Sequence, residues 1–298
     1  MRIRYVPADP AGNLTALVLT PVAQEQRASI AARLMRAAGM EQAAFIDEES
    51  LLSPLPRMDM MGGEFCGNAT RAFGLYAARR RNLGEHELLV RVSGAREPVR
   101  VTLDRVRDRA FAHMPLPIAL ETISVAFPAG DGIEIDAYAC PAADSGENAP
   151  RQAHRPACPN CNPDRRETRR LNVPVVRMEG IAHAVLLHTP PSPALAQAVL
   201  QAMPSEDAQG VLFTTGKRMT PLVHVAATGT SVWESSCGSG SVALAWLLSR
   251  NLPDGRHAFS FEEPGGTLEV SIHVRSGRAV SAMMGGRVTL AAEREADV

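Results

Sequence analysis

Two nearly continuous apolar stretches of helical length each begin just after a Cys-Gly pair. The first covers Thr70–Arg79 and the second Ser241–Leu248. Asn or Gly near the end of each stretch, with Pro253 beyond the second, is typical of helix ends. Because Val242–Leu248 is apolar on nearly every face, we expect that helix to be buried within a sheet.

The rest of the chain alternates between short apolar segments and turn residues. Helical spacing of apolar positions predicts an amphipathic helix over Gln24–Met40, ending near Gly39, and another over Pro193–Met203. Short strands surround the two apolar helices, so we expect an α+β chain of two similar halves. The expected strands lie at residues 3–5, 14–19, 45–46, 57–61, 88–92, 99–103, 111–114, 133–138, 173–180, 182–187, 211–213, 222–226, 258–261, 268–274, 279–283 and 287–290.

The division between the halves is expected at the Pro-Leu-Pro segment 115–117. The N-terminal half, 1–116 plus 280–298, would carry the first Cys-Gly turn. The C-terminal half, 117–279, would carry the second. Residues 140–170 are rich in Pro, Ala, Arg and Asn, which predicts an inserted surface loop of a length unusual inside a compact domain.

Composition narrows the classes of function. The chain has 298 residues, 45% hydrophobic and 21% charged, as expected for one large or two ordinary globular domains. A formal net charge of −1 gives no basic face for nucleic acid or an anionic membrane. We find neither an apolar run of about 18 residues nor the apolar core of a secretory signal near Met1. The sequence therefore predicts a cytoplasmic protein.

Four residues of the predicted loop form a candidate zinc set. Cys158 and Cys161 have Cys-x-x-Cys spacing, and Cys140 and His154 lie nearby. This residue set could bind structural zinc, but its spacing matches no standard finger. A plain surface loop is the favoured interpretation, and a zinc-dependent, non-enzymatic binding module is the alternative from a different class of function.

Cys66 and Cys237, 171 positions apart, are the candidate catalytic residues. Each precedes a predicted helix, where unpaired backbone N–H groups and the helix dipole lower a thiol's pKa and can seat a carboxylate. If the halves face each other, a small carboxylate-bearing ligand would lie between two thiols. The alternative is a pair of buried structural cysteines.

With these turns placed, the chain resembles the diaminopimelate epimerase structural family of cofactor-independent amino-acid racemases. The resemblance covers nearly the whole length and implies two pseudo-symmetric halves, each a curved, mostly antiparallel sheet around a central helix. The matching residues are Gly12–Asn13, Cys66–Asn68 with Arg71, Gly180 with His183, and Cys237–Gly240.

The resemblance implies a two-base reaction at Cα, in which one cysteine removes the α-proton and the other returns a proton to the opposite face. It implies no pyridoxal phosphate or other cofactor, no metal in the site, an amino acid as substrate, and a homodimer. Backbone N–H groups would stabilise the carboxylate as it gains enediolate character. The substrate-binding residues implied in the two turns and near the N-terminus are Asn13, Gly67, Asn68, Gly238 and Ser239.

Two departures bear on the substrate. Diaminopimelate epimerases have Asn-Pro-His where this chain has Ile181–His183, and Glu-Arg where it has Thr228–Gly229. Without the groups that bind its distal ammonium and carboxylate in that family, diaminopimelate is disfavoured as the substrate. Diaminopimelate or hydroxyproline epimerisation remains an alternative on the same fold. His183 is expected to be a core histidine rather than a catalytic one.

A third departure favours histidine. Glu64 precedes Cys66 by two residues, and Trp233–Glu234 precedes Cys237. These positions resemble the histidine racemases that make D-histidine for opine-type metallophores. Glu64 and Glu234 are therefore expected to bind the imidazole or the amine; alternatively, both are ordinary turn residues. Arg71 is expected to be solvated or paired with Glu64.

Overall fold

The computed structural model describes residues 1–81, 84, 86–128 and 168–298. Cys140, His154, Cys158 and Cys161, and thus the candidate zinc set, lie outside the described residues. Its helices and strands are β1 (Arg2–Asp9), β2 (Thr15–Val18), α1 (Gln24–Ala38), β3 (Gln42–Ile46), the 3₁₀ helix η1 (Glu49–Leu52), β4 (Arg57–Met60), α2 (Gly67–Arg81), β5 (Glu87–Val92), β6 (Val99–Asp104), β7 (Arg109–Met114), β8 (Ala119–Pro128), β9 (Thr168–Met178), β10 (Ile181–Leu186), α3 (Pro193–Ala202), β11 (Ala208–Thr215), β12 (Arg218–Val225), β13 (Thr230–Trp233), α4 (Gly238–Ser249), β14 (Gly255–Glu263), β15 (Gly266–Arg275), β16 (Arg278–Arg287), β17 (Thr289–Leu290) and β18 (Arg294–Asp297).

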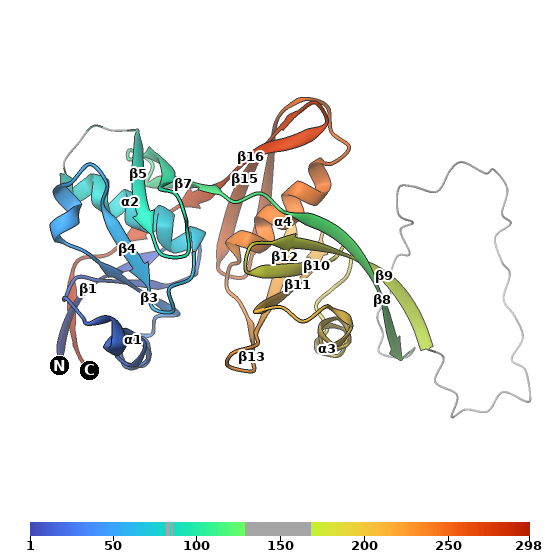
Figure 1. Cartoon of the computed structure of the whole chain (residues 1–298), viewed down its shortest axis with the longest axis horizontal. Helices are drawn as coiled ribbons and strands as arrows, with labels where there is room; N and C mark the ends of the chain where they lie inside the picture. The colour runs from blue at the N-terminus through green and yellow to red at the C-terminus, as the bar shows by residue number, and fades with distance from the viewer. Residues whose placement is uncertain (82–83, 85, 129–167) are drawn as a thin grey trace, which may run out of the picture.

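The chain forms two lobes, each with one apolar helix inside a curved sheet (Figure 1). α2 packs against β5, β6 and β7 in the first lobe, and α4 packs against β15, β16 and β9 in the second. Twelve consecutive residues of α2, Gly67 to Ala78, are buried, so this helix has no solvent-facing side over most of its length. The α+β class predicted from the sequence is confirmed.

Strand pairing repeats between the lobes. The first lobe runs β1 to β7, and its neighbouring strands pair antiparallel, parallel, antiparallel, parallel, antiparallel and antiparallel. The same series of pairings links β9, β10, β11, β12, β14, β15 and β16 in the second lobe. α2 and α4 occupy equivalent places in this series, between its fourth and fifth strands. The two Cys-Gly turns are therefore structurally equivalent.

The shorter amphipathic helices follow their sequence signals. α1 buries Ile30, Ala31 and Leu34 on one face and ends at Gly39, whose φ of 66° is left-handed. α3 starts with Ser192, whose Oγ accepts from the Leu195 N–H at 3.2 Å, and with a proline in its first turn. Within the described part of the chain, no helix is long and apolar enough to cross a membrane.

The lobes are joined along one edge and touch near the cysteines. β7 pairs antiparallel with β16 from Ala282↔Met114 to Arg287↔Arg109, which makes the two sheets continuous. On the other side, Gly12 packs on Gly265, and a Cβ at Gly12 would lie 2.2 Å from the Gly265 Cα. This close approach brings the β1–β2 turn against the β14–β15 turn.

Candidate active site

Cys66 lies immediately before the first turn of α2. Its carbonyl accepts from the Thr70 N–H at 2.9 Å and from Thr70 Oγ1 at 2.7 Å, which closes the start of the helix. Its Sγ accepts from the Ala69 N–H and from Gln42 Nε2, both at 3.5 Å. The thiol therefore faces two donors, one of them from the helix N-terminus.

Cys237 is the N-cap residue of α4, with extended backbone angles. Its carbonyl accepts from the Ser241 N–H at 2.9 Å, as Cys66 does from Thr70. Its own N–H donates to Glu263 Oε2 at 2.6 Å, and its Sγ shares a hydrogen bond of 3.6 Å with Ser239 Oγ. Cys237 is only 5% exposed.

The starts of the two helices meet at one methionine. A Cβ on Gly67 would lie 2.8 Å from the Met284 Cε, and a Cβ on Gly238 would lie 2.5 Å from the same methyl group. Met284 is fully buried. Glycine at both positions thus lets two helix N-termini approach the same point, which brings the predicted turns together.

Asn68 and Arg71 connect the first turn to the second lobe. Asn68 Nδ2 donates to Ser236 Oγ at 3.0 Å, and Asn68 Oδ1 accepts from Arg71 Nε at 3.2 Å. Arg71 is fully buried and also donates to the carbonyls of Gly286 and Arg287. The expectation that Arg71 is solvated or paired with Glu64 is wrong, because α2 is enclosed on the side where Arg71 projects. Burial lowers the pKa of Arg71 to about 10.

Asn13 reaches the site through Gln42. Asn13 Oδ1 accepts from Gln42 Nε2 at 2.5 Å, and that same amide faces the Cys66 thiol. Asn13 Nδ2 donates to Glu41 Oε2 at 3.3 Å, and Glu41 Oε1 accepts from Ser235 Oγ at 2.6 Å. A chain of polar contacts therefore runs from Cys66 across to the turn before Cys237.

His183, on β10, contacts the second cysteine turn. Its Nε2 and Ser239 Oγ share a hydrogen bond of 2.9 Å, and its ring packs on Gly210 of the neighbouring strand. The ring is fully buried, and burial lowers its pKa to about 4, so it is neutral at pH 7. The structure agrees with a core histidine, which orients Ser239 beside Cys237.

The two glutamates lie in different environments. Glu64 is exposed, and its backbone carbonyl accepts from Ser93 Oγ at 2.9 Å. Glu234 is partly buried beside Cys237, and its charge raises the pKa of both Cys66 and Cys237. Burial raises the pKa of Glu234 to about 7, while a hydrogen bond with Cys237 lowers it.

Neither thiol has the low pKa expected from its position at a helix start. Burial raises the pKa of Cys66, although the Ala69 N–H and the Gln42 amide lower it. Burial also raises the pKa of Cys237 well above its ordinary value, and the charges of Glu234 and Glu263 raise it further. The expectation is wrong because desolvation and nearby carboxylates outweigh the helix dipole.

The raised pKa of Glu234 predicts a pH dependence of stability. Between pH 4.5 and pH 7 the unfolded chain has lost this proton and the folded chain retains it, so stability falls as pH rises through this window. Glu234→Gln should remove that loss, up to about 3 kcal/mol. Urea unfolding at pH 4.5 and pH 7.5 measures it. Glu262→Gln, at an exposed glutamate, is the control, and an equal pH effect in both variants would contradict the prediction.

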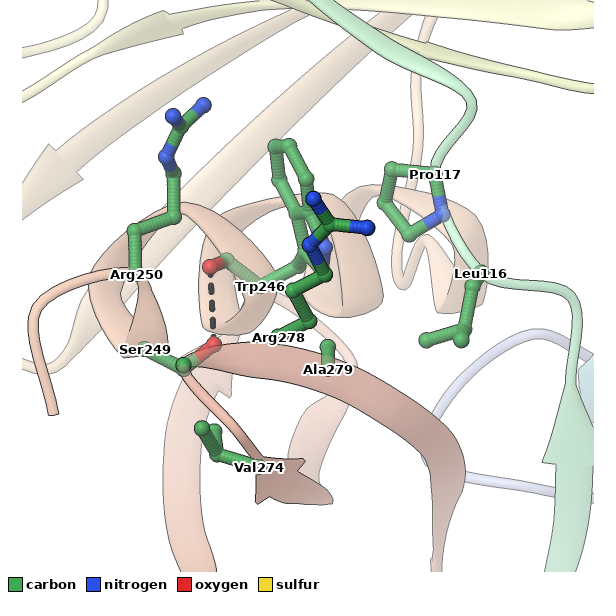
Figure 2. A pocket seen from close by; sticks show the side chains of 9 residues that line it. Leu116, Pro117, Trp246, Ser249, Arg250, Val274, Arg278 and Ala279 are labelled. Atoms are coloured by element: carbon green, nitrogen blue, oxygen red, sulfur yellow. Dashed lines mark hydrogen bonds between the residues drawn. The ribbon is translucent and has the colours of Figure 1, made fainter. Parts of the chain in front are cut away.

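Two surface hollows lie away from the cysteines. The one in Figure 2, about 290 Å³, lies between the Leu116–Pro117 linker, the end of α4 and the β15–β16 hairpin. Trp246, Arg250 and Arg278 line it, and Ser249 Oγ donates to the Trp246 carbonyl at 2.8 Å. The other, about 360 Å³, lies against β14 and β15. Neither contains a predicted site residue, so we assign the site from the paired turns.

Several polar residues that contact the two cysteine turns were not predicted from the sequence. Glu263, Gln42 and Ser236 contact the two turns from distant positions in the chain, and nothing in their local sequence marks them. Gln42 follows a predicted helix end, and Glu263 lies two residues beyond a predicted strand that ends at residue 261. Only the pairing of distant strands reveals their contacts.

Solved structures share the fold. A predicted epimerase from Pseudomonas aeruginosa matches with a TM-score of 0.59 at 14% identity, over 99% of both chains. A PhzF-family phenazine biosynthesis protein from Enterococcus faecalis has a TM-score of 0.58 at 14% identity, over 100% of both chains. A hydroxyproline epimerase from Agrobacterium vitis has 0.57 at 12% identity, over 99% of this chain and 92% of that one. The fold is thus PhzF-like and proline racemase-like.

The protein is an isomerase of the racemase and epimerase class, and its two cysteine turns are structurally equivalent. The chain belongs to the family described as the histidine racemase CntK N-terminal domain, whose model matches residues 2–136 and 154–296. It is similar to a histidine racemase of Fusobacterium nucleatum subsp. nucleatum, 26% identical over 83% of this chain and 81% of the relative. A histidine racemase of Staphylococcus aureus is 23% identical over 90% of this chain and 88% of the relative.

Proposed function

We propose that the protein racemises histidine at Cα with Cys66 and Cys237 as the two acid–base groups. The observation that carries this proposal is the meeting of two equivalent cysteine turns at Met284. The thiolate of one cysteine takes the α-proton, and the thiol of the other gives its proton to the opposite face. One proton is removed and one is returned, so the substrate changes only its configuration.

The helix starts supply the electrostatic part of the reaction. The N–H groups of Gly67, Asn68, Gly238 and Ser239 lie in the first turns of α2 and α4. They would receive the substrate carboxylate, whose negative charge grows as the α-proton leaves. Burial of this region strengthens those contacts. Asn13 would contribute by accepting a hydrogen bond from the Gln42 amide, which also donates to the Cys66 thiol.

Histidine as the substrate is supported by the family and by two similar curated histidine racemases. Glu234, partly buried beside Cys237, would accept a hydrogen bond from the imidazole or the amine, and Glu64 would act from the rim. Hydroxyproline epimerisation is the second candidate, because a hydroxyproline epimerase shares the fold. Diaminopimelate is a further one.

We also propose the finer features that the resemblance implies. These are a diaminopimelate epimerase-type fold, which the repeated strand pairing supports, and a division into 1–116 plus 280–298 and 117–279, with β16 crossing the boundary because it pairs with β15 on one side and β7 on the other. A homodimer, a cytoplasmic location and a supply of D-histidine to an opine-type metallophore complete the proposal. The alternative, a zinc-dependent binding module built on Cys140, His154, Cys158 and Cys161, is tested by metal analysis of purified protein; about one equivalent of zinc would support it.

Exchange of the α-proton in D₂O, followed by proton NMR, tests the function. We expect L-histidine to lose its α-proton signal and D-histidine to form, because deuterium returns from a thiol that has exchanged with solvent. Hydroxyproline and diaminopimelate serve as the competing substrates. Exchange on one of these alone would replace the substrate and keep the mechanism. No exchange on any of them, with the thiols reduced, would overturn the proposal.

A further inference from the structure

The two equivalent turns differ in charge. The fifth residue after the cysteine is Arg71 in the first turn but Val242 in the second. The fourth is Thr70 or Ser241, and these hydroxyls have different partners. Thr70 Oγ1 donates to the Cys66 carbonyl, whereas the Ser241 Oγ donates to Glu263 at 2.5 Å. A buried cation thus stands behind one cysteine and a buried carboxyl group beside the other.

Glu263 occupies the start of α4. Its Oε2 accepts from the Cys237 N–H at 2.6 Å and its Oε1 from Ser241 Oγ, and it is 7% exposed. The N-terminus of a helix carries roughly half a positive charge, enough to favour one anion there. Burial raises the pKa of Glu263 to about 8, which is still below that of Cys237. The carboxyl group therefore ionises first, and Cys237 keeps its proton.

The start of α2 has the opposite arrangement. Arg71 is fully buried, and among the described residues its Nη2 has no hydrogen-bond partner. After burial, the charge of Cys66 has the largest effect on the pKa of Arg71. Among the described hydrogen bonds, none joins a carboxylate to the first turn of α2. The negative charge that this helix start favours is therefore available to Cys66.

The other charged groups do not reverse this order. Glu234 raises the pKa of both thiols, but it is hydrogen-bonded to Cys237, and after burial its charge is the largest contribution there. Its effect therefore adds to the difference between the thiols. Glu64 also raises the pKa of Cys66, but its side chain is exposed and solvent screens its charge. Arg71 and Glu263 are the buried charged groups that differ between the two turns, and Glu234 acts on Cys237 in the same direction as Glu263.

We propose that Arg71 and Glu263 make the two thiols unequal, so that in the resting enzyme Cys66 is the base and Cys237 the acid. This inference rests on the proposed function. Cys66 Sγ takes the α-proton, and Cys237 gives its thiol proton to the other face. The charge then lies on Cys237 beside Glu263, so this form of the free enzyme is the less stable one. Glu263 is a positioning residue that acts through Cys237.

Alkylation of the resting protein tests the inference without turnover. Iodoacetamide reacts with thiolates, and peptide mass spectrometry separates the two sites. We expect the pH midpoint for Cys66 to lie below that for Cys237, a comparison that does not depend on how exposed each thiol is. The reverse order in the wild-type protein would overturn the proposal.

Glu263→Gln keeps the size of the side chain and removes its charge. We expect the rate at Cys237 at pH 8.5 to rise at least about tenfold, since a neighbouring anion is lost, and the rate at Cys66 to stay within about twofold. Glu262→Gln, on the exposed face of the same strand, is the matched control. An unchanged rate at Cys237 in a folded Glu263→Gln protein would also overturn the proposal. Because alkylation needs no substrate, these outcomes are separate from failure to racemise histidine.

Exchange of the α-proton of histidine in cysteine variants tests the same difference between the two thiols during catalysis. Cys66→Ser leaves only a protonated thiol, so neither histidine isomer should exchange its α-proton. Adding Glu263→Gln to Cys66→Ser should restore measurable exchange of one isomer, since Cys237 then ionises more readily. If Glu263 has a structural role alone, the double variant will exchange neither isomer, and this result in a folded protein would contradict the proposal.

Discussion

Replacing Cys66 or Cys237 with serine is expected to lower kcat/KM for histidine racemisation by at least about a thousandfold. A serine hydroxyl keeps its proton at neutral pH and so cannot act as the base. It is also a much weaker acid than a thiol. General acid–base catalysis typically contributes about 10²–10⁴-fold, and each variant removes one of its two groups. Chiral chromatography of reactions started from L- and from D-histidine measures the loss in both directions.

Two comparisons keep this test specific. Cys140→Ser removes a thiol outside the two turns and should leave the racemisation rate unchanged. Far-UV circular dichroism of each variant should match the wild type, because a serine fits where a cysteine lay. Turnover retained by both the Cys66 and the Cys237 variants would rule out the two-thiol mechanism.

The second large effect is expected from Gly12→Ala at the contact between the lobes. Gly12 has a φ of +86°, and its added Cβ would lie 2.2 Å from the Gly265 Cα, a backbone atom that cannot turn aside. The lobes must therefore shift apart. We expect a loss of about 2–4 kcal/mol of stability and about a hundredfold of activity, since a displacement near 1 Å disturbs the catalytic geometry. Thermal unfolding and kcat measure the two effects.

Gly39→Ala separates backbone strain from collision. Gly39 also has a left-handed φ, of 66°, but an added Cβ there meets nothing within 4 Å. This variant should lose about 1 kcal/mol of stability and no activity. If Gly12→Ala behaves in the same way, the lobe contact is not needed for catalysis.

The helices were predictable because their signals are local. The apolar stretches at Thr70–Arg79 and Ser241–Leu248 lie inside α2 and α4. Both helices begin earlier than expected, at Gly67 and Gly238, because glycine is a weak helix former and hides the first turn from a propensity argument. Tertiary contact at Met284 stabilises these first turns, and the sequence does not show that contact.

The acid–base environment was not predictable for a related reason. A cysteine before a helix suggests a low thiol pKa, and this part of the argument is local. The opposing effects come from burial and from Glu263, which lies 26 positions beyond Cys237 and is brought to it by the return of β14. Arg71 was misassigned in the same way, because its burial depends on strands of both lobes.

The two edges of the lobe contact are unequal in strength. One is a ladder of six residue pairs between β7 and β16. The other includes the hydrogen bonds Asn68–Ser236 and Glu41–Ser235 and the packing of Gly12 on Gly265. Each such hydrogen bond contributes only about 1 kcal/mol, so the lobes can swing apart about the ladder far more readily than they can separate. Histidine would then enter and leave by a hinge motion of the two lobes. Release of the product, rather than proton transfer, would then be the rate-limiting step.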